Sequence, residues 1–174
     1  MLKRPAETEY DAFYKGYLAQ VTEADVMALL ARQCEDVAAA ARPFSPDREN
    51  HAYGPGKWTV RELFGHLNDA ERVFGYRAVC IARGDKASFP GFDEQVYVAR
   101  SRFSTVPLAE LVEEFTLLRK ANLAAFRRHD DAAWDERGTA NNNPVTVRAI
   151  PFIMAGHVKH HLKVLAERYA PAAG

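Results

Sequence analysis

The stretch Gly156-His157-Val158-Lys159-His160-His161-Leu162 holds three of the chain's six histidines. It lies inside Val147–Tyr169, whose apolar spacing predicts one long helix. On a helix, His157 and His161 lie one turn apart on a face that is otherwise apolar and should meet the core. Two neutral imidazoles at this spacing can converge on one metal ion. The same pair could instead be hydrogen-bonded core histidines, and His160 could replace one member, so a third ligand elsewhere has to decide.

The length and composition of the chain favour one domain without a nucleic-acid or membrane role. We expect a single domain over residues 1–174, in which residues 1–21 form an N-terminal arm or short helix. Lys and Arg together number 23, as do Asp and Glu, so the net charge favours neither nucleic acid nor an anionic membrane. No apolar run approaches the ~20 residues of a membrane span, and the N-terminus lacks a signal-peptide core. Cys34 and Cys80 form no redox or metal motif, so a reducing, cytoplasmic compartment is expected.

Four long segments repeat apolar residues at helical spacing, and they set the predicted fold. They run approximately over Thr22–Ala41, Thr59–Arg83, Leu108–Arg128 and Val147–Tyr169. Thr22, which opens a capping-box pattern, Thr59 and Thr146 are the expected N-caps. The fold class is therefore all-α, a four-helix bundle with a short extra N-terminal helix and long connecting loops.

The connections between these segments carry two further expectations. No alternating run survives its flanking Gly and Pro residues, so we expect no β-hairpin, and residues 130–144 should form a polar loop. The connection over residues 88–104 is long enough to cross the end of the bundle. A simple up-and-down order of helices is therefore not assured.

The second helix supplies the third histidine. His66 lies at the edge of the apolar stripe of that helix, about two turns after Thr59. One ligand from this helix and two from the last, with room for water, is the open three-ligand arrangement of catalytic metal sites. Asp69, Glu71 and His160 are candidates to accept a hydrogen bond from the far nitrogen of a ligand. For the two carboxylates, a solvated position is the alternative.

Three motifs in this order resemble the DinB-like superfamily, and most of all its branch of bacillithiol S-transferases and metal-dependent hydrolases. They are Trp58-Thr59-Val60-Arg61-Glu62-Leu63-Phe64-Gly65-His66-Leu67-Asn68-Asp69-Ala70-Glu71, Pro90-Gly91-Phe92-Asp93-Glu94 and His157-Val158-Lys159-His160-His161. The resemblance extends from about Ala24 to Tyr169 and implies a bundle of the DinB-like type.

The resemblance also implies a metal site and partners. The divalent ion would be zinc or nickel, held by His66, His157 and His161, and the protein would form homodimers that use a low-molecular-weight thiol as cosubstrate. Many members carry a Gly-Gln pair two residues after the last ligand, where this chain has Lys163-Val164. This departure bears on helix packing or partner binding and leaves the ligands untouched.

Three functions remain open at this point. The first is a metal-dependent transferase that activates a small-molecule thiol for S-transfer to an electrophilic substrate. The second is a hydrolase that uses metal-bound water, although the sequence offers no carboxylate base such as the Glu of a His-Glu-x-x-His motif. The third is a non-catalytic, metal-stabilised dimeric binding module.

Overall fold

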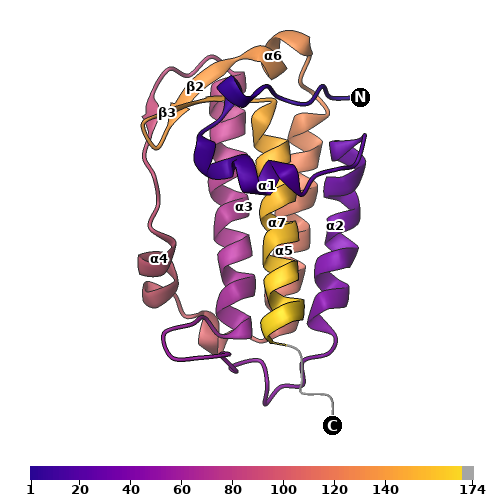
Figure 1. The fold of residues 1–174 in the computed structure, drawn as a ribbon, viewed down its shortest axis with the longest axis vertical. Helices are drawn as coiled ribbons and strands as arrows, with labels where there is room; N and C mark the ends of the chain where they lie inside the picture. The colour runs from indigo at the N-terminus through magenta and orange to yellow at the C-terminus, as the bar shows by residue number, and fades with distance from the viewer. Residues whose placement is uncertain (170–174) are drawn as a thin grey trace.

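The computed structural model of the chain, which describes residues 1–169, contains four long helices lying side by side (Figure 1). The last five residues of the predicted domain lie outside the described residues. The long helices are α2 (Val26–Ala41), α3 (Val60–Ala82), α5 (Leu108–Phe126) and α7 (Ala149–Arg168). The predicted helical bundle is therefore confirmed. In the described part of the chain, no helix is long and apolar enough to cross a membrane.

The helix starts follow from their capping residues. The Thr59 hydroxyl accepts a hydrogen bond from the Glu62 amide at 3.2 Å, and the Glu62 carboxylate accepts one from the Thr59 amide at 2.8 Å, which confirms the predicted cap of α3. For α2 the predicted start at Thr22 is wrong, because the carboxylate of Asp25 accepts from the amides of the first turn instead. The three residues Thr22–Ala24 are therefore not part of α2.

The last helix begins slightly later than predicted. It starts at Ala149, whose amide donates to the Thr146 hydroxyl at 3.2 Å. Thr146 thus still supplies a capping oxygen, although it belongs to the preceding strand. Pro151 fits in the first turn, where its missing amide hydrogen breaks no helical hydrogen bond.

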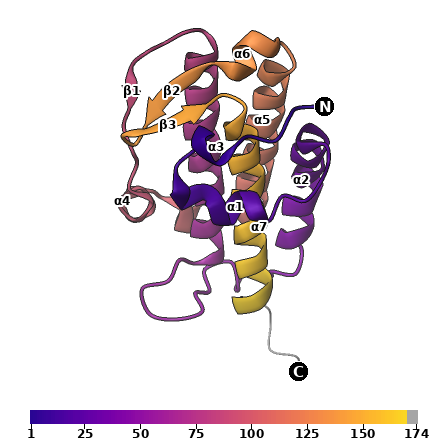
Figure 2. The same ribbon diagram turned by 45° about the horizontal axis from the view of Figure 1, so that its top comes forward.

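The order of the helices is not simple up-and-down. Helices α3 and α5 are neighbours and run parallel to each other. Helices α2 and α7 are also neighbours and parallel to each other, and both run antiparallel to α3 and α5 (Figures 1 and 2). The connection over residues 83–107 therefore returns along the whole side of the bundle. It carries β1 (Ser88–Phe89), α4 (Glu94–Arg100) and a 3₁₀ turn at Phe103–Thr105.

A small sheet covers one end of the bundle, and the expectation of no β-hairpin is wrong. After the short α6 (Asp131–Asp135), β2 (Arg137–Ala140) pairs antiparallel with β3 (Asn143–Thr146), and β1 pairs parallel with β2. Asn141 and Asn142 join the two strands with φ of 50° and 61°. Asparagine tolerates this left-handed backbone, which a two-residue hairpin turn requires. Proline is accepted in β3 because β3 is an edge strand.

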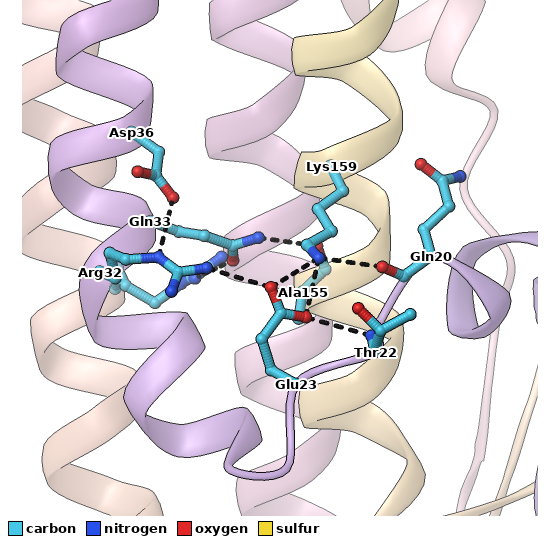
Figure 3. Close-up of polar contacts among 9 residues, drawn as sticks. Gln20, Thr22, Glu23, Arg32, Gln33, Asp36, Ala155 and Lys159 are labelled. Carbon is cyan, nitrogen blue, oxygen red and sulfur yellow. Dashed lines mark hydrogen bonds and ion pairs between the residues drawn. The ribbon is translucent and has the colours of Figure 1, made fainter.

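The N-terminal segment crosses the bundle instead of extending from it. After two 3₁₀ turns, α1 (Lys15–Ala19) lies across α7 (Figure 1). Gly156 permits this approach, since a Cβ at that position would lie 2.2 Å from the Tyr17 carbonyl oxygen. Beyond the crossing, Lys159 of α7 donates to the Gln20 carbonyl at 2.9 Å and to the Glu23 carboxylate at 2.7 Å (Figure 3). Lys159 is thus held by this segment and does not lie on a solvated face.

The core consists of two apolar clusters with polar side chains between them. We call these side chains the polar layer: Gln33, Glu71, Arg119 and Asn122. Arg119 pairs with both carboxylate oxygens of Glu71, at 2.7 and 3.0 Å, and donates to the Gln33 side chain at 2.9 Å. Gln33 donates in turn to the Ala155 carbonyl at 2.8 Å. The polar layer therefore links all four long helices beside the segment that carries His157.

Candidate metal centre

The three predicted ligands meet in the structure. His66 extends from α3, and His157 and His161 extend from α7 on one face. The Nε2 atom of His157 lies 2.9 Å from that of His66 and 3.1 Å from that of His161. Their exposed fractions are 5%, 6% and 9% for His66, His157 and His161. The prediction that these three side chains share one site therefore agrees with their positions.

The donor set fits a divalent metal ion. Three nitrogens bound tetrahedrally to zinc at 2.0–2.1 Å would lie about 3.3 Å from one another, close to the observed separations. Hydrogen bonding alone accounts for the cluster poorly, because one imidazole nitrogen has either one proton or one lone pair in the ring plane. His157 Nε2 can therefore make only one good hydrogen bond to its two neighbours. A cation between the three lone pairs would satisfy all of them.

The surroundings keep the three imidazoles in the neutral form that ligation requires. Burial, assisted by the nearby His160, lowers the pKa of His66 to about 4. Burial and the neighbouring histidines hold the pKa values of His157 and His161 well below the usual value. The site therefore presents uncharged nitrogen donors down to acidic pH.

A cavity of about 870 Å³ opens beside the triad. Helix α7 supplies the histidine side of its wall, and Phe, Tyr and Trp rings from the N-terminal segment, α3 and the two connections that flank α3 supply much of the rest. The aromatic lining residues are Phe13, Tyr14, Tyr17, Trp58, Phe74 and Phe92. The Trp58 ring centroid lies 4.7 Å from that of His66, and the Tyr17 centroid lies 5.6 Å from that of His157. A ligand of the metal would thus bind beside aromatic rings, in a cavity that also has charged side chains in its wall.

The three candidate supporting residues have different positions. His160 lines the cavity, and its ring lies 5.0 Å from that of His161 and 5.3 Å from that of Tyr17. Glu71 is neither solvated nor beside a ligand, because its carboxylate pairs with Arg119. Asp69 is half-buried, and burial raises the pKa of its carboxyl; the nearby charges that act on this pKa are those of Arg72 and Glu114. Within residues 1–169, none of the three hydrogen-bonds a ligand ring, and the buried His66 Nδ1 has no partner.

Sequence reasoning missed most of the cavity wall. Arg77 lines the cavity and is only 5% exposed, which is unusual for an arginine. Its position in sequence, three residues after Phe74 and four before Ile81, places it on the apolar stripe of α3. A charge at such a position is a signal that could have been read. Tyr14 and Phe92 gave no comparable signal, because only the crossing of α1 and the return of the long connection bring them to the site.

The departure at Lys163-Val164 leaves the helix packing intact. Lys163 is exposed and lies 3.8 Å from Glu167 as an ion pair, while Val164 packs against the second apolar cluster. Helix α7 continues through both residues to Arg168. Both residues therefore lie within the same continuous helix as His157 and His161.

Comparison with known proteins agrees with this architecture. The sequence profile of the DinB superfamily matches residues 16–165. The chain resembles the solved structure of YfiT from Bacillus subtilis, described as a probable metal-dependent hydrolase with an unusual four-helix bundle topology. The TM-score is 0.74 at 16% identity, over 95% of this chain and 90% of YfiT, so this likeness concerns the fold. No curated protein sequence matched the chain. Because the profile covers most of the chain, this protein belongs to the DinB superfamily.

Proposed function

We propose that this protein is a divalent-metal-dependent transferase that activates a low-molecular-weight thiol and joins the thiol, through its sulfur, to an electrophile. His66, His157 and His161 would hold the ion, zinc or nickel. The observation that carries the proposal is the set of three buried imidazoles at the wall of the cavity. Within the described residues, no carboxylate or thiol joins them.

The donor set explains why a thiol suits this site. When bound by three neutral ligands, a divalent ion keeps its full charge and stabilises the anionic form of a thiol beside it. The chain contributes by keeping the imidazoles uncharged and by surrounding the site with aromatic rings. Trp58 and Phe92 both lie against His66, with ring centroids at 4.7 and 6.5 Å, and shield that ligand from water.

The proposed reaction conserves atoms and charge. The S–H bond of the thiol breaks and its proton passes to solvent. The sulfur then forms a bond to an electrophilic carbon of the second substrate, and the leaving group departs with the electron pair of the broken bond. Neither Cys34 nor Cys80 is among the residues that line the cavity, so the sulfur comes from the added thiol.

A hydrolase is the second candidate, and one observation favours it. The carboxylates of Asp11, Asp93 and Glu94 line the cavity, so the structure offers acids that the sequence motifs did not. Asp11 and Asp93 accept hydrogen bonds from backbone amides of the following residues. Glu94 lies exposed at the cavity and is the carboxylate that could take a proton from an attacking water. YfiT, which shares the fold, is described as a probable metal-dependent hydrolase.

The test compares thiol conjugation and hydrolysis in the same zinc-loaded protein. A panel of small thiols is mixed with chlorodinitrobenzene, and product formation is followed by absorbance. A thiol with a pKa of about 8.5 is roughly 3% ionised at pH 7, so full ionisation at the site would raise the thiolate fraction about 30-fold. The metal-free protein and His157→Ala should lose the acceleration. Cys34→Ala and Cys80→Ala should retain it.

Each other outcome selects a different function. Metal-dependent cleavage of an ester or amide that does not require a thiol would favour the hydrolase. If neither activity is found and removal of zinc dissociates a homodimer in sedimentation, the protein would be a metal-stabilised binding module.

A further inference from the structure

Two arginines are more than nine-tenths buried, and they differ in how their charge is compensated. Arg119, which is fully buried, pairs with both oxygens of Glu71. For Arg77, no carboxylate in the described part of the chain lies within 4.0 Å of the guanidinium. Its Nη2 atom donates to the Pro90 carbonyl at 2.6 Å. A buried, uncompensated guanidinium is unfavourable, and burial lowers the pKa of Arg77 below its usual value.

This guanidinium and the histidine triad line the same cavity. The ring of Phe74 connects the two groups, because its centroid lies 6.1 Å from that of His157 and 6.0 Å from the Arg77 guanidinium carbon. Arg77 follows His66 by eleven residues on α3, which is about 16 Å along the helix axis. The metal centre and the positive charge thus lie at separate places on one aromatic-walled cavity.

The other charged side chains that line the cavity are acidic, and they are more exposed. Asp11 is half-buried, whereas Asp93 and Glu94 are exposed. The charge that is buried in the wall is therefore positive. Tyr14, whose phenol lies beside the guanidinium, offers a further polar group at the same place. The lining therefore combines one buried positive charge with three more exposed negative charges, and an anion would bind at the buried guanidinium.

We propose that Arg77 is the binding residue for a carboxylate carried by the thiol substrate, at the end remote from its sulfur. A guanidinium is planar and matches the two oxygens of a carboxylate. The carboxylate would supply the negative charge that the protein does not place beside Arg77. That the other end of this substrate is a thiol rests on the proposed function. The site for the carboxylate rests only on Arg77 and its surroundings.

The test measures binding of a matched pair of thiols to the zinc-loaded protein by calorimetry. 11-Mercaptoundecanoate and 11-mercaptoundecanamide have the same length, differ in charge, and are long enough to place the sulfur at the triad and the other end at Arg77. The native protein should bind the acid about 10-fold or more tightly than the amide, as expected for a charge-assisted hydrogen bond. Arg77→Gln should bind the two thiols with equal affinity. Arg77→Lys, which keeps the charge, should retain part of the preference.

Control variants separate this role from a structural one. Glutamine at position 77 is shorter than arginine and loses the hydrogen bond to the Pro90 carbonyl, so affinity for the uncharged amide thiol is the internal control. Loss of that connection alone would weaken binding of both thiols equally, whereas loss of the charge weakens binding of the acid only. Arg72→Gln removes an arginine from the same helix, where Arg72 pairs with Glu114 outside the cavity. It should leave the preference for the acid unchanged. The melting temperature of each variant is measured alongside, and Arg77→Lys decides the question if Arg77→Gln does not fold.

The proposal is overturned if the native protein binds both thiols equally. It is also overturned if the preference survives in Arg77→Gln, because the carboxylate would then contact the ion. If neither thiol binds, the thiol chemistry of the proposed function fails, and the subsite is measured with benzoate and benzamide on the same proteins. A preference for benzoate that Arg77→Gln abolishes would still support the subsite, and its absence would refute it.

Discussion

Gly156 is a position at which the backbone of the N-terminal segment lies directly against α7. A Cβ added there would lie 2.2 Å from the carbonyl oxygen of Tyr17, 2.5 Å from its carbonyl carbon and 2.9 Å from its Cα. All three atoms belong to the backbone, so no side chain can rotate to make room. Gly156→Ala should therefore push α1 away from α7.

The size of the effect follows from this geometry. An ordinary contact requires α1 to move by about 1 Å, and overpacking of this kind costs about 1–3 kcal/mol. Alanine is the better helix former by about 1 kcal/mol, which offsets part of that cost. If α1 separates entirely, Leu18 and Val21 lose their burial in the core, at about 1.5–3 kcal/mol each. With α1 still in place, we expect Gly156→Ala to lower the free energy of unfolding by up to about 2 kcal/mol.

The assay is a urea titration of the metal-free protein, with Gly16→Ala as the matched control. Gly16 lies within α1, and a Cβ there would meet nothing within 4 Å. Gly16→Ala should therefore be neutral or slightly stabilising, through helix propensity alone. Equal effects of the two substitutions would refute the close approach of α1 to α7. A loss beyond about 4 kcal/mol would indicate that α1 has detached.

Three further predictions concern the metal site and the polar layer. Alanine at any ligand position should lower the zinc content measured by mass spectrometry, whereas His160→Ala should retain it; the reverse result would refute the ligand set His66, His157 and His161. The metal-free protein should lose stability as the pH falls from 6.5 toward 4. In the unfolded chain His66 takes up a proton over this range, whereas the buried His66 of the folded protein, with a pKa of about 4, does not, and for His66 alone the loss is roughly 3 kcal/mol. Urea titrations that show no such trend would contradict this prediction. Arg119→Met should cost about 3–5 kcal/mol by leaving Glu71 as an unpaired buried charge, and adding Glu71→Leu should recover much of this loss in thermal unfolding.

The bundle could be predicted from sequence because its signals are local. Apolar spacing places the long helices, and the pattern around Thr59 and Glu62 identifies the start of α3 within one short segment. The β-hairpin escaped prediction because its strands are short and lack alternation, and Pro144 lies within one of them. Its formation depends on the backbone of Asn141 and Asn142 and on packing over the end of α3, where Gly138 lies against Ile81.

The clustering of the three histidines could be predicted for the same reason, and the cavity could not. His157 and His161 share a helix face by their spacing alone, and His66 follows a recognisable helix start. Glu71 could not be separated from a surface residue, because its partner Arg119 lies 48 positions away in sequence. The wall around the metal centre depends on how α1 and the long connection return to the bundle, which no local pattern specifies.

The polar layer also bears on the uniqueness of the fold. Apolar side chains on helices fit together in several ways, and either cluster could accept α7 displaced by one turn. Only one register allows Gln33 to reach the Ala155 carbonyl while Arg119 keeps both Gln33 and Glu71. A displaced helix would leave buried polar groups unpaired, so the layer selects the alignment that brings His157 opposite His66. We expect a chain with an entirely apolar layer to remain folded but to sample several helix alignments, and so to bind metal less tightly.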